Sequence, residues 1–428
     1  MRSYTTQGGG RPVAGMRRLS TALLAMTLAG SIACNALLTV DNPGRVPADA
    51  LSDPALIPIL ESASLQQFQC GFAAFVATGG MLSSEYLSAN GFVNNHPWEW
   101  RGDVEIRGAP GTCNVGRATT SMGFYTPLQE ARFQLDDVAA RLTDFTDAQV
   151  PNRTRIMTEM RAYAGYAYTL LAEGMCEMTI DNGPRMTKAE VLAIAEQRFT
   201  DAIASATAPA DASLKNMALV GRARTRLDVG NLAGAAADAA LVPQGFVRNA
   251  EFSETTPTRE NRLYNLTVRN DFLSVGPDYR DLTVGTLPDP RVKVTNMNRI
   301  GNDNVTPVWQ QQKFTGSGAV SLPIASWNEA QLILAEAVGG QAGIDAINRV
   351  RAANGVPALV ADPTSDITPL VIEERRRQLF SEGQRYVDML RKNLPFVTGV
   401  NRKGQTFGTV TCVPLPDVET LNNPNFKP

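Results

Sequence analysis

Apolar side chains recur at spacings of three and four residues over much of the chain, which is the pattern of one buried face of an α-helix. We predict helices over 54–77, 116–142, 156–174 and 192–202, and a further pair of helices over 327–337 and 344–350. Residues 217–243 carry two such series, separated by the turn "DVGN" and ended by Pro243. The predicted inward positions are Ile156, Met160, Tyr163, Ala167, Leu170 and Gly174; Leu192, Ala195, Phe199 and Ala202; Leu219, Ala223 and Leu227; and, on the returning helix, Leu232, Ala236 and Ala240.

The segment 217–243 is a helical hairpin of tetratricopeptide type, with small residues where two helices cross closely. Two regions break the helical pattern. Residues 78–115 are rich in Gly, Asn and aromatic side chains, and residues 244–325 contain short β-like runs such as "RLYNLTV" and "RVKVTNM". We therefore predict a mostly α fold. Its tetratricopeptide-like hairpins, at about 116–243 and 326–392, form one large domain with long irregular loop regions and a few short β-strands.

The N-terminus carries an export pattern. Two arginines after Met16 precede a short apolar run and then small residues before Cys34. We predict a signal peptide over 1–33, with translation starting at Met16, and a lipid-anchored tether over 34–50 before a domain at 51–428. Ser31 and Ala33 before Cys34 resemble a bacterial lipoprotein box, in which the thiol is acylated. Ordinary cleavage near Ala33 is the alternative.

The net charge and the histidine count limit the kinds of site that the protein can have. The 428 residues have a net charge of -2 and include one histidine, His96. The charge gives no global field for nucleic acid, and a single histidine makes Ser-His-Asp catalysis and His-based metal sites improbable, so we expect no cofactor and no metal.

Four cysteines follow Cys34, and an exported chain can form disulfides. Three connectivities are possible. We favour Cys70–Cys113 with Cys176–Cys412, because the first bond ties the N-terminal helix to the loop that follows it.

Several motifs together resemble one family. Cys34 is followed by "LLTVDNPGRVP"; "WNEAQLILAEA" (327–337) precedes "INRVRAANGVPAL" (347–359); "EERRRQLFSEGQRYVDMLR" (373–391) precedes the closing "VPLPDVETLNNPNF" (413–426). This is similar to the SusD/RagB family of outer-membrane nutrient-uptake lipoproteins. The resemblance implies a SusD-like fold and a non-enzymatic protein. It implies capture of an oligosaccharide or similar nutrient, and delivery to a SusC-like TonB-dependent barrel transporter. It also implies anchoring in the outer membrane through Cys34, facing the cell exterior.

The charged stretch 373–391 reads as one helix. Glu373 reaches Arg377 at i+4, and Glu382, Arg385, Asp388 and Arg391 follow at i+3 steps. Such pairs add little on a free surface. We therefore expect the helix to pack against the hairpins through Ile372, Leu379, Tyr386 and Leu390, with its charges partly buried and mutually satisfied.

The stretch "NNHPWEWRGD" is the best candidate for ligand contact, because sugars present flat C–H faces that aromatic rings can cover. Trp98 and Trp100 are the candidate platforms. We expect at least one of them to be buried and to pin the loop, and His96 more often fixes a loop than binds a ligand. The candidate hydrogen-bonding residues are Asn95, His96, Glu99 and Arg101, and the secondary aromatic candidates are Tyr86 and Tyr279. Trp327 is predicted to be core, and Trp309 to lie on a strand packed against the hairpins.

Two other functions remain open from the sequence. One is an exported helical glycoside hydrolase that uses paired carboxylates. The other is a tetratricopeptide scaffold that binds protein partners on its concave face.

Overall fold

The computed structural model describes residues 50–93, 95–113 and 122–426. It separates a first unit, ending at Asp53, from a second unit that begins at Pro54. The predicted signal peptide and Cys34 lie outside the described residues. The helices of the second unit are η2 (Pro54–Leu56), α2 (Ile57–Leu82), α3 (His96–Trp100), α4 (Asp103–Arg107), α5 (Tyr125–Arg141), η3 (Leu142–Asp144), α6 (Arg153–Gly174), α7 (Lys188–Ser205), η4 (Pro209–Asp211), α8 (Ala212–Asp228), α9 (Leu232–Ala240), η5 (Pro257–Arg259), α10 (Arg262–Tyr264), η6 (Asn265–Arg269), η7 (Pro277–Tyr279), α11 (Trp327–Val338), α12 (Gly340–Ala353), α13 (Thr368–Gln378), α14 (Gln384–Arg391) and α15 (Asp417–Asn422).

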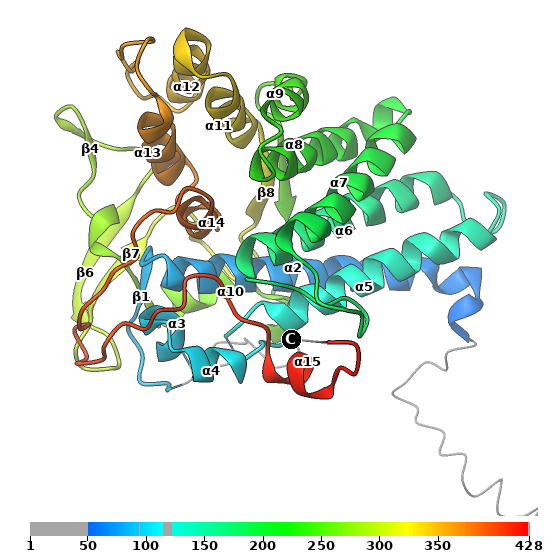
Figure 1. Cartoon of the computed structure of the whole chain (residues 1–428), viewed down its shortest axis with the longest axis horizontal. Helices are drawn as coiled ribbons and strands as arrows, with labels where there is room; N and C mark the ends of the chain where they lie inside the picture. Colours follow the sequence, from blue (N-terminus) through cyan, green and yellow to red (C-terminus); the bar gives the residue numbers. More distant parts are fainter. Residues whose placement is uncertain (1–49, 94, 114–121, 427–428) are drawn as a thin grey trace, which may run out of the picture. The chain divides into compact units, whose positions relative to one another are not determined.

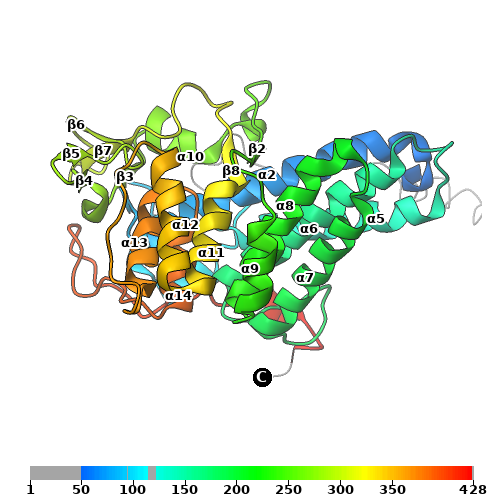
Figure 2. The same cartoon turned by 90° about the horizontal axis from the view of Figure 1, so that it is seen from above.

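The mostly α prediction is confirmed. Helices α2, α5, α6, α7, α8 and α9 pack one against the next in that order, and α11 then packs against α8, α9, α12 and α13 (Figure 1). Viewed from above, α8 and α9 lie beside the group formed by α11, α12, α13 and α14 (Figure 2). No described helix combines the length and the apolar composition needed to cross a bilayer.

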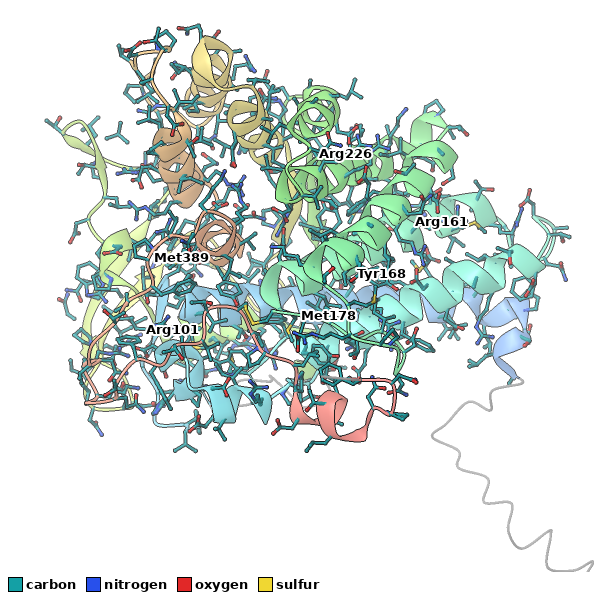
Figure 3. All side chains as sticks on the ribbon, viewed as in Figure 1. Arg101, Arg161, Tyr168, Met178, Arg226 and Met389 are labelled. Atoms are coloured by element: carbon teal, nitrogen blue, oxygen red, sulfur yellow. A yellow bond between two sulfur atoms is a disulfide. The ribbon has the colours of Figure 1, made fainter. Side chains whose placement is uncertain are left out.

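The predicted inward faces of α6 and α7 are buried, but the face predicted for α9 is wrong by one position. Ala235, Asp238 and Ala239 are buried, whereas Leu232 is 45% exposed. The apolar pattern predicted the wrong face because one of the buried residues of α9 is a carboxylate, Asp238. Asp238 accepts hydrogen bonds from Arg222 Nε (2.8 Å) and from Arg226 Nη1 (2.9 Å), both on α8, and so its charge is compensated. Arg226 is labelled in Figure 3.

Three helices meet at the Phe199 ring of α7, which is fully buried. A Cβ atom on Gly165 of α6 would lie 2.7 Å from that ring, and one on Gly221 of α8 would lie closer still. Gly221→Ala should therefore lower the free energy of unfolding by about 1–3 kcal/mol, because the core cannot take up an added methyl without strain. Urea unfolding measures the change. Gly91→Ala is the matched control, since its Cβ would meet nothing nearer than Asn302 O at 4.0 Å. Equal stability of the two variants would contradict this packing.

The region 244–325 holds most of the strands, in antiparallel pairs: β1 (Tyr86–Ser88) with β3 (Leu273–Val275), β2 (Val247–Ala250) with β8 (Leu322–Ser326), β4 (Thr283–Val284) with β5 (Leu287–Pro288), and β6 (Val294–Ile300) with β7 (Pro307–Gln311). In β1–β3, Tyr86 faces Val275. The run "RVKVTNM" contributes to β6, as predicted. Trp309 lies on β7 and packs against the core, and Trp327 is buried.

The run "RLYNLTV" is helical rather than extended, so that prediction is wrong. Asn261 caps it by accepting from Tyr264 N (3.1 Å). Thr267 donates back to Leu263 O (2.7 Å), and Leu263 and Leu266 are both buried at i, i+3 spacing. A short apolar run fits either period, and here the cap and the core select the helix.

Two disulfides join distant parts of the second unit. Cys70 of α2 is bonded to Cys113, with a Cα–Cα distance of 6.1 Å, and Cys176 is bonded to Cys412, with a Cα–Cα distance of 5.0 Å. This is the connectivity that the sequence analysis favoured. The first bond holds the segment after α4 against α2, and the second holds the C-terminal segment beside the end of α6.

The charged stretch 373–391 forms two helices, α13 and α14, and not the single helix predicted. Ser381 (φ 64°) and Gly383 (φ 80°) take the left-handed conformation that ends one helix before the next begins. The Glu373–Arg377 pair at i+4 is present at 2.6 Å, but Glu382 pairs with Lys313 (2.6 Å) and not with Arg385. The expected burial is confirmed for Ile372, Leu379 and Tyr386, and Leu390 is half-buried.

Candidate functional site

The short helices α3 and α4 shape one of the cavities of the described chain. Pro97 stands in the first turn of α3, where a missing N–H costs nothing. Arg101 ends α3 in the left-handed conformation (φ 60°), and Gly102 then leads into α4. In Figure 1 both helices lie below α2.

A cavity of about 610 Å³ opens beside these helices; we call it the α3–α4 cavity. This volume is in the range that holds a small-molecule ligand. The described residues that line it are Val93, His96, Pro97, Trp100, Glu105, Gly108, Ala109, Pro110, Gly111, Thr112, Met122 and Gln405.

Close backbone approach builds the wall opposite α3. Gly111 has φ +90°, and a Cβ there would collide with the Gly123 carbonyl. Thr126 N donates to Pro110 O (3.0 Å), and the disulfide at Cys113 fixes the same segment to α2. The wall is therefore held on both sides of the cavity residues Gly111 and Thr112.

The two candidate tryptophans face opposite ways. Trp98 is 1% exposed and packs on Phe124, with 6.5 Å between ring centroids. Trp100 is half-buried and lines the α3–α4 cavity. The expectation that one tryptophan pins the loop is met by Trp98, which no ligand can reach in this structure.

Glu99 holds loops together and does not face the cavity. Its buried carboxylate accepts from Ser88 N (2.7 Å) and from Arg402 Nη2 (3.1 Å), and Arg402 Nη1 also bonds it. Arg402 Nε in turn donates to Thr306 Oγ1 (2.5 Å). Glu99 thus ties α3 to β1 and to the C-terminal loop, and its buried carboxylate accepts three hydrogen bonds from these two partners.

Arg101 has a similar structural role. Its Nη2 donates to Val397 O (2.5 Å), and the guanidinium lies over the rings of Phe396 (5.1 Å) and Phe407 (5.6 Å). Burial lowers the pKa of this guanidinium. Arg101, labelled in Figure 3, therefore fastens the C-terminal loop to the end of α3.

Asn95 is fully buried, and so it is not a ligand contact here. His96 lines the cavity with one face, while its Nε2 lies 2.6 Å from Asn90 O and 3.3 Å from Lys403 Nζ. His96 therefore fixes a loop as well as contributing to the cavity.

The secondary candidates Tyr86 and Tyr279 are inside the protein. The Tyr86 hydroxyl lies 2.5 Å from Ser381 Oγ. Tyr279 stacks on Phe380 at 5.1 Å, beneath the Arg376 guanidinium. Both rings are buried, because aromatic residues in loop regions still bury their rings where the loop covers a core.

Of the described lining residues, sequence reasoning named His96 and Trp100 as candidates, and among those that it missed are Glu105, Thr112, Met122 and Gln405. Glu105 is nearest to the predicted stretch and lies on the exposed side of α4. Gln405 is brought in from the C-terminal loop, and no local pattern near residue 405 could have indicated this contact.

The described lining combines an aromatic surface with a small number of hydrogen-bonding groups. Trp100 supplies an aromatic surface, and Glu105 and Gln405 supply hydrogen-bonding groups. Glu105 is the only carboxylate among the described lining residues. Between residues 50 and 426, the described side chains include no group of three or more His, Cys, Asp or Glu residues placed to hold a metal.

No family model matches the chain, and no curated protein matches it in sequence. Solved structures do match its fold. A laminarin-binding SusD-like protein shares 15% identity, with a TM-score of 0.63 over 86% of this chain and 98% of that one. A SusD-like carbohydrate-binding protein from Bacteroides vulgatus shares 14% identity, with a TM-score of 0.65 over 87% and 97%. A SusD superfamily protein from Bacteroides thetaiotaomicron shares 13% identity, with a TM-score of 0.64 over 87% and 99%. The chain therefore has a SusD-like fold.

Proposed function

We propose that this protein binds a carbohydrate nutrient in the α3–α4 cavity and does not alter it. The observation that carries the proposal is Trp100, a half-buried indole on the wall of a cavity of about 610 Å³, in a chain with a SusD-like fold. An indole face matches the C–H face of a sugar ring, and Glu105 and Gln405 can bond the hydroxyl groups. Two of the fold neighbours are described as laminarin-binding and carbohydrate-binding.

The presence of a single carboxylate among the described lining residues favours binding without hydrolysis. Glycoside hydrolysis uses a pair of carboxyl groups that flank the scissile bond. Glu105 has no second carboxylate beside it among the described lining residues. Release of reducing sugar from a bound oligosaccharide, abolished by Glu105→Gln, would support the hydrolase instead.

Trp100→Ala should weaken oligosaccharide binding by about 10–100-fold, because it removes about 1.5–3 kcal/mol of aromatic burial. A glycan array identifies the ligand, and isothermal titration calorimetry measures the change. Trp309→Ala is the matched control, since Trp309 is a half-buried tryptophan on β7 outside the cavity. Equal binding by wild type and Trp100→Ala would refute this site.

The wider role that we propose is nutrient uptake at the outer membrane, as in the SusD/RagB family. In this proposal Cys34 carries the lipid anchor, the protein faces the cell exterior, and a SusC-like TonB-dependent transporter receives the nutrient. Support comes from the export pattern before Cys34 and from the fold. Purification from solubilised outer membranes should recover a barrel protein together with this chain and an acylated Cys34. Recovery of the unacylated chain alone from the periplasm would refute this role.

A further inference from the structure

A second hollow region runs along α2, away from the α3–α4 cavity. It consists of two adjoining cavities, of about 310 and 370 Å³, which share Leu65, Gln69 and Glu251 as lining residues. Because these residues belong to both, the two cavities form one groove, which we call the α2 groove. Each half is large enough for part of a ligand of small-molecule size.

One wall of the α2 groove is a polar face of α2. Ser62, Gln66 and Gln69 line it at spacings of four and three, which places them on the same side of the helix. From Ser62 to Gln69 the helix rises about 10 Å at 1.5 Å per residue. The groove thus presents a hydroxyl and two amides in a row.

The opposite wall comes from β2 and the segment after it. Asn249, Glu251 and Phe252 line this side, and Arg259 Nε donates across to Gln66 Oε1 (2.8 Å). Phe252 is half-buried and gives the wall an apolar surface. Polar groups and one aromatic ring therefore face the amide row.

Several of these polar groups are available to a ligand. The side chains of Ser62, Gln69, Asn249 and Glu251 make no hydrogen bond or ion pair with any residue that the structure describes. Together they offer both donors and acceptors. Charge on the groove is mixed, because the carboxylates of Glu251 and Glu260 and the guanidinium groups of Arg248 and Arg259 all line it. Such a surface suits a ligand rich in hydroxyl groups and without net charge.

The groove is tied to the first site by a disulfide. Cys70 lines the α2 groove, and its partner Cys113 directly follows Gly111 and Thr112, which line the α3–α4 cavity. The Cys70–Cys113 disulfide therefore connects a wall of the α2 groove to a wall of the α3–α4 cavity.

We infer that the α2 groove is a second binding site, for a neutral oligosaccharide. The ligand class rests on the proposed function, but the site itself is independent of the residues that carry that function. Its recognition would use the amides of Gln69 and Asn249 and the carboxylate of Glu251, with Phe252 beneath a sugar ring.

The test uses the full mature chain carrying Trp100→Ala, so that binding at the first site is weakened. The probes are neutral hexasaccharides of β-1,3-glucan, β-1,4-glucan, α-1,4-glucan and β-1,4-mannan, with hexagalacturonate as the anionic comparison, all measured by isothermal titration calorimetry. We expect residual binding of at least one neutral probe. Adding Gln69→Ala and Glu251→Ala should weaken it by about tenfold, since two hydrogen bonds are lost.

Gln341→Ala with Asp345→Ala is the matched control, because it removes one amide and one carboxylate from the surface of α12. This pair should leave the residual binding unchanged. The inference is overturned if the Trp100→Ala chain binds no neutral probe, if the Gln69 and Glu251 changes have no effect, or if hexagalacturonate binds as tightly. If wild type binds and the Trp100→Ala chain does not bind at all, the second site is refuted and the proposed function is not. If wild type binds none of the probes, both the second site and the proposed function are refuted.

Discussion

Asp388→Ala is expected to lower the free energy of unfolding by about 3–5 kcal/mol. The Asp388 side chain is 1% exposed and accepts from Arg375 Nε (2.9 Å) and from Arg391 Nη2 (2.8 Å). Burial alone would raise the pKa of this carboxyl, but the two guanidinium groups outweigh it and lower the pKa. Removing the carboxylate leaves two guanidinium groups in the interior with less compensation. Urea unfolding at pH 7 measures the loss.

The same charged stretch contains the matched control. Glu373 also pairs with two arginines, Arg376 (2.7 Å) and Arg377 (2.6 Å), but its side chain is 40% exposed. Partly exposed pairs contribute about 0–1 kcal/mol. When Glu373 is lost, Arg376 still donates to Asp278 O (2.6 Å) and Arg377 still donates to Asp289 Oδ2 (3.0 Å). Glu373→Ala should therefore change stability far less than Asp388→Ala. Similar losses for the two variants would show that the burial of Asp388 does not set the energetics of this stretch.

Wild type should lose stability as the pH rises from about 5 to 8, and Glu85→Gln should remove a large part of that loss. Glu85 is buried on the turn after α2, and burial raises the pKa of its carboxyl to about 7. Its Oε1 accepts from Ser381 N (2.9 Å), but Oε2 and the Tyr279 hydroxyl have no partner among the described residues. The site therefore stabilises the protonated, neutral form of the Glu85 carboxyl.

The direction of this change in stability with pH follows from proton linkage. A carboxyl whose pKa is about 7 when folded and near 4.5 when unfolded binds more protons in the folded state. Its contribution is complete below the unfolded pKa and is lost as the pH rises through 7, by up to about 3 kcal/mol. Burial also raises the pKa of Glu329 and of Asp228 to about 7, so part of the loss remains in the variant. Urea unfolding at pH 5.5 and 8.0 gives the slope, with Glu105→Gln, at an exposed position, as the control. An unchanged slope in Glu85→Gln would contradict this account.

Local periodicity was sufficient to predict most helices. The inward faces of α6 and α7 follow from three- and four-residue spacing, which reports burial directly wherever the buried side chains are apolar. It failed at 373–391, where the left-handed conformation of Ser381 and Gly383 ends one helix before the next begins. It also failed at α9, where Asp238 is buried and arginines of α8 compensate it. Hydropathy cannot register such compensation, because the partner is not in the same segment.

The sequence by itself determined a mostly α chain and the stretch on which the cavity is built. Only the tertiary structure decided which tryptophan of that stretch faces outward. Trp98 and Trp100 are two residues apart on α3, and a helix turns about 200° over two residues, so only one of them can face the core. Phe124 and the neighbouring core select Trp98, and Gln405 completes the cavity from the far end of the chain. These contacts join residues that are distant in sequence, and their free energy exists only after the chain has folded, which is why local pattern carries no trace of them.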